Sequence, residues 1–526
     1  MLHRRVLRVV LLACVAVVAG FGATANARND ASHTLVVDTS FGIASLDPTF
    51  GQTLARLVSH SRWDTLLTYV GSSLDPKPLL ATGYTASKDL KTFTFTMRPG
   101  TKFADGTALT AADVVFSFQR GQALKGDAAS LLTGITVSSP ARNKVVLRSE
   151  TPNGAIPAIV TSPLLSVLNS DVAKAHGATT EPGKDTAGPW LTSPASQGSG
   201  SGPFTLVQYD VNSQIILGRN LKYWGKRPAY DKIVIRNVPT QTQALNVQRG
   251  TEEVALDLGA QDVSGIRGNS KLKFNTAASP QTFLFFFNND PAISPISANK
   301  QLQQAARASI DYAGVIALAG AGARRPGGVI PAFFPGALPA KDLPKRDLAA
   351  ARRLISQSGV SKPKISIEFP SDRAINGLSF TSVAQKIQAN LQEAGFDVDL
   401  AGEPVTTVLS RYLGGKIAFG IVPNLPTVQD PQETLRFLPG GFLGNIIGWK
   451  AGADNVMTAA AAKAQLLTGD KRNAAWQNVQ KLQQQRGPWI PLVNPSQNVV
   501  YTNDVTGIAY NPAWIIDFRL VKPAKA

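Results

Sequence analysis

Hydrophobic and polar residues follow recognisable periods along the chain, and these periods predict its strands and helices. Residues Phe93–Arg98 (FTFTMR) alternate between apolar and polar, as a half-buried strand does, and Pro99-Gly100 ends the run. Residues Phe283–Phe287 (FLFFF) are apolar throughout, which is typical of a strand buried on both faces. Thr110 with Asp113 forms a capping-box pattern, so a helix is predicted to follow.

Strands and helices alternate in the later part of the chain. Strands are predicted in three places, with helices between them: Lys364–Phe369, Phe396–Leu400 and Ile417–Val422. This alternation predicts parallel strands with crossover helices, and therefore an α/β fold. One continuous helix is predicted earlier, over Gln301–Leu318, because apolar residues recur there at helical spacing.

The strand at Ile417–Val422 leads through a loop to a helix that is predicted to start at Asp430. Asp430 suits the N-cap, Pro431 suits the first helical position, and Glu433 follows the cap at the third. In an open α/β sheet, ligands bind beyond the carboxyl ends of the strands. The junction is therefore a candidate ligand site, and the alternative is that it is only a connection with a capped helix.

The N-terminus has the pattern of a signal peptide over residues 1–27. Two arginines precede an apolar stretch, and Ala25-Asn26-Ala27 offers the small residues of a cleavage site. We expect cleavage near Ala27. Acylation at Cys14 is the alternative, but it would leave an apolar start to the mature chain. Cys14 is the only cysteine, so the mature chain is expected to have no thiol chemistry.

The charged residues argue against nucleic acid as a partner. The chain has 53 Lys+Arg and 35 Asp+Glu, a formal net charge of +18, which would fall by three to +15 on removal of residues 1–27. The basic residues are scattered rather than gathered into a patch. With 526 residues, two or three domains are expected.

The sequence carries no catalytic or metal-binding motif. It has no P-loop, no HExxH, no GxSxG and no EF-hand loop. The histidines of the mature chain, His33, His60 and His176, are not at metal-ligand spacing. No catalytic residue, metal site or cofactor is predicted, and binding is favoured over catalysis.

Several segments together resemble the bacterial extracellular solute-binding proteins of family 5, the dipeptide, oligopeptide and nickel receptors of ABC importers. In chain order these segments are LDP at 46–48, FTFTMRPGTKFADGTALTAADVVFSFQR at 93–120, GSGPFTLVQYD at 200–210, RNLKYWGKRP at 219–228, FFFNND at 285–290, ARASIDYAGVI at 306–316 and NVQKLQQQRGPWIPLV at 478–493. They extend over nearly the whole mature chain.

The resemblance implies a type II periplasmic-binding-protein fold, an α/β fold with two lobes around a ligand cleft plus an inserted third domain. Domain I would comprise residues 28–64, 203–283 and 493–526, the inserted domain II residues 65–202, and domain III, the second lobe, residues 284–492. The GSGSG crossing at 198–202 agrees with a boundary there. Ligand contacts made only in the closed state would favour closure of the lobes.

The function implied by the resemblance is that of a periplasmic receptor for an ABC importer. The receptor, a monomer, would capture a peptide or peptide-like, carboxylate-bearing solute and deliver it to permease subunits in the inner membrane. A receptor for a metal chelate, an opine or an oligosaccharide is the first alternative. An exported enzyme on the same scaffold is the second, and the missing catalytic motif disfavours it.

The resemblance also suggests four ligand-binding residues. Arg373 lies where dipeptide receptors of the family carry the arginine that binds the ligand carboxylate, and a solvated loop arginine is the alternative. Thr427 occupies the position of their ammonium-binding acid but offers no charge, which puts free-amine peptides in doubt. Asn445 and Trp449 lie in a segment that resembles a cleft-lining one, although Trp449 suits a core equally well.

Overall fold

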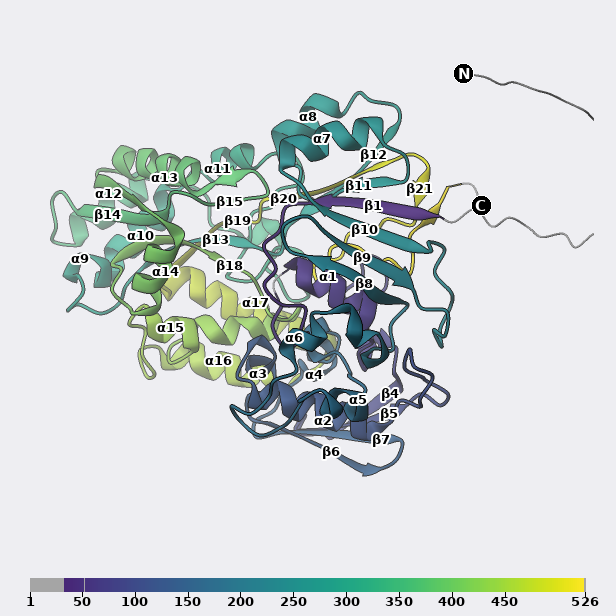
Figure 1. Ribbon diagram of the computed structural model, residues 1–526. Helices are drawn as coiled ribbons and strands as arrows, with labels where there is room; N and C mark the ends of the chain where they lie inside the picture. The colour runs from purple at the N-terminus through teal and green to yellow at the C-terminus, as the bar shows by residue number, and fades with distance from the viewer. Residues whose placement is uncertain (1–32, 52, 525–526) are drawn as a thin grey trace, which may run out of the picture. The chain divides into compact units, whose positions relative to one another are not determined.

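The structure is a computed structural model that describes residues 33–51 and 53–524, so the predicted signal peptide lies outside the described residues. Its strands form three larger sheets (Figure 1). The first sheet has the order β12 (Leu272–Ala278), β20 (Ser496–Thr502), β11 (Glu253–Ala255), β1 (Thr34–Thr39), β10 (Lys232–Asn237), β9 (Gln214–Arg219) and β8 (Phe204–Asp210). Strand β1 runs parallel to both of its neighbours, β10 and β11.

The second sheet is antiparallel. Its order is β4 (Ala81–Ala86), β5 (Thr92–Met97), β7 (Lys144–Ser149) and β6 (Ile135–Ala141), and α2 (Ala111–Ala123) contacts β6 and β7. Every second residue of β5 is buried, which confirms the half-buried strand predicted there. Asp113 Oδ2 accepts a hydrogen bond from the Thr110 amide at 2.8 Å, so the predicted cap also forms.

The third sheet contains the predicted parallel strands. Its order is β17 (Asp397–Glu403), β14 (Lys364–Pro370), β18 (Phe419–Asn424), β13 (Thr282–Phe287) and β19 (Trp489–Val493). Strand β14 is parallel to β17 and to β18, while α13 (Phe380–Ala394) and α14 (Val405–Leu413) connect them as crossovers. The prediction of parallel strands with crossover helices is confirmed.

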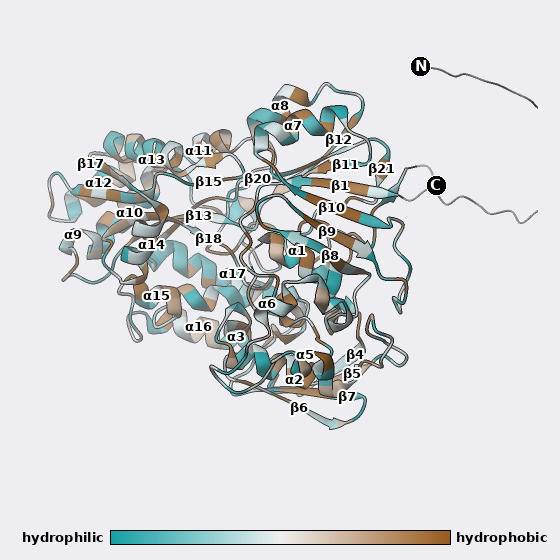
Figure 2. Cartoon of the chain, in the orientation of Figure 1, coloured by the Kyte–Doolittle hydropathy of each residue, from teal (hydrophilic) through white to brown (hydrophobic). Residues whose placement is uncertain are grey.

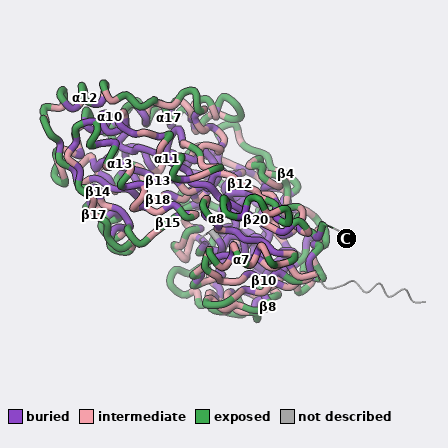
Figure 3. The backbone as a smooth tube through the Cα atoms, turned by 90° about the horizontal axis from the view of Figure 1, so that it is seen from above, coloured by how far each residue is buried: buried purple, intermediate pink, exposed green. Residues whose placement is uncertain are grey.

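Strand β13 is buried along its whole length in the third sheet. Each of its residues is buried between β18 and β19, as the unbroken apolar run predicts (Figure 3). The helices nearby carry both hydrophilic and hydrophobic residues, consistent with one buried face on each (Figure 2). In α13, Phe380, Val383 and Ile387 belong to the cluster that contains three of the four β13 phenylalanines.

The prediction of a single helix over Gln301–Leu318 is wrong. The structure has two helices there, α10 (Lys300–Ser309) and α11 (Tyr312–Ala319), and Ile310 between them is extended. Asp311 caps the second helix, because its Oδ1 accepts a hydrogen bond from the Gly314 amide at 3.0 Å. The apolar period continues across the break, which is why periodicity alone did not reveal it.

The remaining helices of two turns or more lie outside the sheets. They are α1 (Thr53–Arg62), α7 (Thr240–Arg249), α8 (Ala260–Ile266), α12 (Leu348–Gln357), α16 (Asn455–Gln465) and α17 (Gly469–Arg486). Helix α7 contacts β1 and β11, and α8 contacts β20. Within the part of the chain that the structure describes, no helix is both long and apolar enough to cross a membrane.

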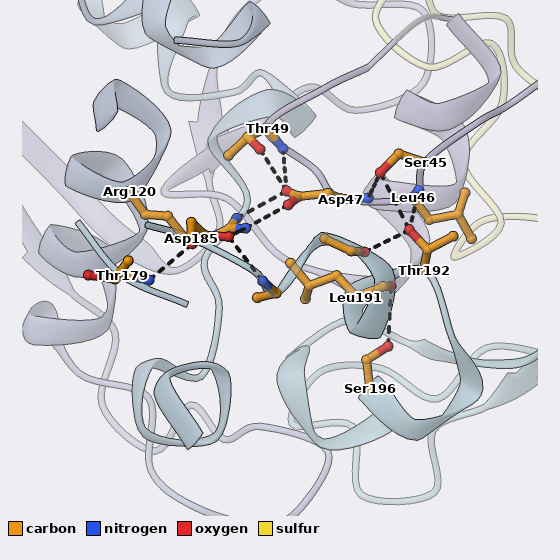
Figure 4. A network of polar contacts seen from close by, with 12 residues as sticks. Ser45, Leu46, Asp47, Thr49, Arg120, Thr179, Asp185, Leu191, Thr192 and Ser196 are labelled. Carbon is orange, nitrogen blue, oxygen red and sulfur yellow. Dashed lines mark hydrogen bonds and ion pairs between the residues drawn. The ribbon is translucent and has the colours of Figure 1, made fainter. Parts of the chain in front are cut away.

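A buried ion network joins the LDP segment to α2 (Figure 4). Arg120 donates to both Asp47 oxygens, at 3.1 and 2.6 Å, and to both Asp185 oxygens, at 2.7 and 2.9 Å. Asp47 also accepts hydrogen bonds from the amide and hydroxyl of Thr49. The side chains of Arg120, Asp47 and Asp185 are 0%, 1% and 4% exposed, so each charge depends on its partners rather than on water.

His60 is held neutral in the folded protein. Its ring stacks on Trp514 with centroids 3.7 Å apart, and Nε2 lies 3.4 Å from a carboxylate oxygen of Asp517. Burial, together with the neighbouring Arg519 guanidinium, lowers the pKa of His60 from 6.5 to about 4. The unfolded chain therefore takes up a proton at a higher pH than the folded chain does.

We predict that this difference destabilises the protein in mild acid. Between pH 6.5 and 4 the unfolded state binds more protons, so lowering the pH from 7 to 5 should reduce the free energy of unfolding by about 2 kcal/mol through His60. Urea unfolding of the wild type and of His60→Gln at both pH values measures this contribution as the difference between the two pH dependences, because Glu253, whose pKa burial raises to about 7, contributes with the opposite sign in both proteins. His60→Gln should remove the contribution of about 2 kcal/mol, and His176→Gln, at an exposed site, should not. An unchanged dependence in His60→Gln would show that His60 is not responsible.

Candidate ligand cavity

A cavity of about 470 Å³ lies at the carboxyl ends of the parallel strands β1 and β11. Its walls come from segments that are far apart in the sequence: residues 39–45, Gly51, Leu54, Ala55, Asp127, Leu256, Asp257, Gln281, Asn376 and Gln497, with Phe50 and Ile515. Ser40 follows β1, and its amide and hydroxyl donate to Asp257 Oδ2 at 3.1 and 2.6 Å. The location matches the general rule for ligand crevices in α/β sheets.

A hairpin that follows β14 brings Asn376 to the cavity. Its strands are β15 (Ala374–Ile375) and β16 (Leu378–Ser379), and Asn376-Gly377 forms the two-residue turn with φ of 50° and 81°. Both values lie in the left-handed region, which Asn and Gly tolerate best. The turn of the hairpin therefore places Asn376, from the segment after β14, in the wall of the cavity.

The hairpin tip is bonded to the first sheet. Asn376 Nδ2 donates to the Ser496 carbonyl at 2.9 Å and to Gln497 Oε1 at 3.1 Å. A Cβ at Gly377 would lie 2.9 Å from the Gly259 Cα, so this contact needs a glycine. Segments of the first and third sheets thus meet at one wall of the cavity.

The chain passes between the same two sheets at two places beside the cavity. Residues 279–281 connect β12 to β13, and residues 494–495 connect β19 to β20. The two connections are hydrogen-bonded to each other, from the Ser279 amide to the Pro495 carbonyl at 2.8 Å. Gln281 and Gln497, on or next to them, both line the cavity. A change at these connections would change the walls of the cavity directly.

Thr427 lies at a different cavity, of about 560 Å³, whose walls include Val428, Gln432 and Glu433 and residues of the second-sheet region. Its hydroxyl donates to Glu433 Oε1, and Glu433 also pairs with Arg436 at 3.1 Å. The uncharged residue Thr427 therefore has a carboxylate partner six residues further along the chain. The Glu433 side chain bonds to Thr427 and Arg436 among the described residues and not to the backbone amide of Asp430.

Asp430 has the structural role that the start signal indicates. Its Oδ1 accepts a hydrogen bond from the Gln432 amide at 2.8 Å and caps a 3₁₀ helix, Pro431–Phe437. Its carboxylate also receives two hydrogen bonds from Arg472, at 2.7 and 2.9 Å. Both residues line a further cavity of about 700 Å³ that is bordered by Phe333, Phe334 and other largely apolar side chains.

The structure does not bring the four proposed ligand residues together. Arg373 is partly buried near the base of the hairpin and is absent from the walls of the cavities described above. Asn445 is exposed, lines a separate hollow of about 450 Å³ and donates to the Gly440 carbonyl. Trp449 is 4% exposed and packs in the cluster that contains Phe437 and Trp489.

Sequence reasoning did not select the residues that do line the cavity, such as Asp127, Asp257 and Asn376. The Asn376-Gly377 pair is a hairpin signal that was available in the sequence. Asp257 follows a strand of only three residues, which leaves no periodic pattern. Among the described residues, no group of three or more His, Cys, Asp or Glu is arranged to hold a metal ion.

Residues 75–442 match the model of the family described as bacterial extracellular solute-binding proteins, family 5 Middle. The chain belongs to this family. Curated relatives include the probable D,D-dipeptide-binding periplasmic protein DdpA of Escherichia coli K12, which is 24% identical over 446 residues, 84% of this chain and 83% of the relative. The nickel-binding periplasmic protein of the same organism is 23% identical over 490 residues, 85% of this chain and 87% of the relative.

Solved structures of the family share the fold. HbpA2 from Haemophilus parasuis has a TM-score of 0.78 at 20% identity, over 93% of this chain and 99% of that one. DppA from Helicobacter pylori, in complex with the peptide STSA, has a TM-score of 0.74 at 20% identity, over 94% and 98%. AgaA from A. tumefaciens R10, in complex with agropinic acid, has a TM-score of 0.73 at 20% identity, over 94% and 99%. The predicted type II periplasmic-binding-protein fold is confirmed.

Proposed function

We propose that the chain is the periplasmic solute receptor of an ABC importer and captures a peptide or peptide-like solute that carries a carboxylate. The observation that carries this proposal is the cavity at the ends of β1 and β11, defined above by its walls. Its volume lies in the range usual for small-molecule sites. Because its walls include the hairpin tip and the two sheet-to-sheet connections, a solute there would stabilise the closed arrangement.

The proposal includes the export and the domains expected from the sequence. Residues 1–27 would be removed on export, and domain I (28–64, 203–283 and 493–526) and domain III (284–492) would close on the solute, with domain II at 65–202. The closed receptor, as a monomer, would dock on permease subunits in the inner membrane. Relatives that are named as periplasmic support this location.

Arg373 remains our candidate for the solute carboxylate. It lies on the segment that leads into the hairpin, outside the described cavity walls, and burial lowers the pKa of its guanidinium from the usual value. The other three candidates are weaker. Thr427 and Asn445 lie at other hollows, and Trp449 lies in the core. A C-terminally amidated peptide should therefore lose affinity in the wild type but not in Arg373→Ala.

The second candidate function is reception of a non-peptide solute. It is favoured by relatives whose names specify nickel and agropinic acid. If the solute is a chelate, the described residues would recognise its organic part, since they present no cluster of three metal ligands. An exported enzyme is a more remote alternative, because the named relatives are binding proteins.

Calorimetric titration tests the proposal with a cavity-filling variant. Gly42 lines the cavity, and a Cβ there meets no atom within 4 Å, so the backbone at Gly42 has room for the first side-chain atom of Gly42→Trp, whose indole should occupy part of the cavity. Gly268 is equally open but lies outside the cavity walls, and Gly268→Trp is the matched control. The panel consists of di- to tetrapeptides, a nickel chelate, an opine and an oligosaccharide.

We expect at least one peptide to bind, Gly42→Trp to weaken it at least tenfold, and Gly268→Trp to leave its affinity unchanged. Binding of only the chelate, opine or oligosaccharide would favour the second candidate function. Peptide binding that is insensitive to Gly42→Trp would place the site elsewhere. Turnover of any solute by the purified protein would contradict a receptor that only binds.

A further inference from the structure

The charged side chains that line the cavity are both acidic. Asp127 and Asp257 are the charged residues among its described walls, and those walls contain no lysine, arginine or histidine. The polar remainder consists of hydroxyls, such as those of Thr39 and Ser45, and of the side-chain amides of Gln281, Asn376 and Gln497. Each of these groups can accept a hydrogen bond. The lining is therefore suited to a donor with positive charge.

Asp257 has no basic partner in the described chain. Its Oδ2 accepts the two hydrogen bonds from Ser40, while Oδ1 is buried near the side-chain amide of Gln243 and accepts no hydrogen bond of ordinary geometry from the described residues. No described Lys, Arg or His lies within 4.0 Å of either oxygen. Burial raises the pKa of Asp257, as expected for a carboxylate without a counter-ion. A bound cation would favour its ionised form.

Asp127 reaches the cavity from the second-sheet region, at the start of α3 (Asp127–Leu131). Its Oδ2 accepts a hydrogen bond from the Gly51 amide at 3.0 Å, and this bond leaves Oδ1 for another donor. Arg56 is the basic group that interacts with Asp127 through its charge, but the two form no ion pair within 4.0 Å. The Arg56 guanidinium donates instead to the Gly51 and Pro426 carbonyls.

The local negative charge contrasts with the whole chain, whose formal net charge is +18. Exposed charges more than about 8 Å apart are largely screened at physiological ionic strength. Asp257 is partly buried and is therefore screened less, whereas Asp127 is exposed and acts on a solute only at contact distance. The charge of the cavity lining, rather than that of the chain, should therefore decide which solutes are held.

We propose that the cavity recognises a positively charged group of its solute, an ammonium or a guanidinium, through Asp257 and Asp127. This inference rests on the proposed receptor function and names the class of solute for the same site. The sequence puts free-amine peptides in doubt because position 427 lacks an acid. Asp257 and Asp127 supply the missing charge from other segments of the chain, so free-amine solutes return as the expected class.

The test compares matched peptides by calorimetry on the mature, full-length receptor. Ala-Leu-Ala carries a terminal ammonium, N-acetyl-Ala-Leu-Ala carries none, and N-acetyl-Ala-Lys-Ala carries its cation on the side chain. Each is titrated into the wild type, Asp257→Asn and Asp127→Asn. Asp470→Asn, at an exposed site on α17, is the control for the same change in net charge.

We expect acetylation of Ala-Leu-Ala to weaken binding at least tenfold in the wild type and in Asp470→Asn. In Asp257→Asn or Asp127→Asn, the ratio between the affinities of the free and the acetylated peptide should shrink to about threefold or less. Neither peptide can form the charge-assisted hydrogen bond in these variants, so acetylation no longer removes it. Asp127→Asn keeps the test informative if Asp257→Asn does not fold. Recovery of affinity with N-acetyl-Ala-Lys-Ala would assign the cation to a side chain instead of the terminus.

Equal binding of the free and acetylated peptides would overturn this inference and leave the receptor function intact. An acetylation effect of the same size in both carboxylate variants would also overturn it, because the cation would then be bound elsewhere. Binding of a neutral oligosaccharide, with no binding of any of the three peptides, would contradict the inference and the peptide proposal together.

Discussion

Arg120→Met should lower the free energy of unfolding by about 3–5 kcal/mol, the usual loss when one member of a buried ion pair is removed. The change leaves Asp47 and Asp185 buried without their shared cation (Figure 4). Burial alone would lower the pKa of Arg120, but the hydrogen bonds to the two carboxylates raise it above its usual value, so the arginine stays charged. Urea unfolding near neutral pH measures the effect.

Arg142→Met is the matched control for this prediction. Arg142 is exposed in the turn between β6 and β7, and we expect its removal to change the free energy of unfolding by less than about 0.5 kcal/mol. Similar small losses of the free energy of unfolding in both variants would contradict the importance of the buried network.

The network also explains two segments of the family resemblance, since LDP supplies Asp47 and FSFQR supplies Arg120.

Arg472→Met should destabilise the protein by about 3 kcal/mol, because it leaves the Asp430 carboxylate buried without its partner. The two side chains are each 9% exposed and are joined by two hydrogen bonds. Asp430→Asn should cause a loss that is not additive with that of Arg472→Met. The coupling in the double variant, measured by urea unfolding, reports the pair itself.

A second arginine–carboxylate pair with two hydrogen bonds, whose arginine is more exposed, provides the comparison. Arg411 donates to both oxygens of Glu368, at 2.8 and 3.0 Å, but its side chain is 49% exposed. Arg411→Met should therefore lower the free energy of unfolding by less than about 1 kcal/mol. If the loss in Arg411→Met matched the loss in Arg472→Met, burial would not be the reason for the strength of the Asp430–Arg472 pair.

Sequence reasoning predicted the parts of the fold that are set by local patterns. The alternation in β5 and the apolar run of β13 depend on which faces are buried, and this is written into consecutive residues. The parallel order of β14, β17 and β18 followed from the alternation of strands and helices. The break at Ile310 was missed because Asp311 forms its cap within an uninterrupted apolar period.

The cavity could not be predicted in the same way, because its residues come from separate segments. Ser40 and Asp257 lie 217 positions apart and meet only because β1 and β11 are paired. Asn376 reaches the first sheet through a hairpin after β14. The family resemblance directed attention to Thr427, but the charges that line this cavity lie at Asp127 and Asp257. Whether those charges bind the solute is the subject of the calorimetric test.

A crystal structure of the receptor with its tightest-binding peptide tests the central claim most directly. We predict solute density in the cavity at the ends of β1 and β11, in contact with Asn376 and with a cationic group beside Asp257. Density in the cavity bordered by Phe333 and Arg472, or in the one at Thr427, with none at Asp257, would contradict the account.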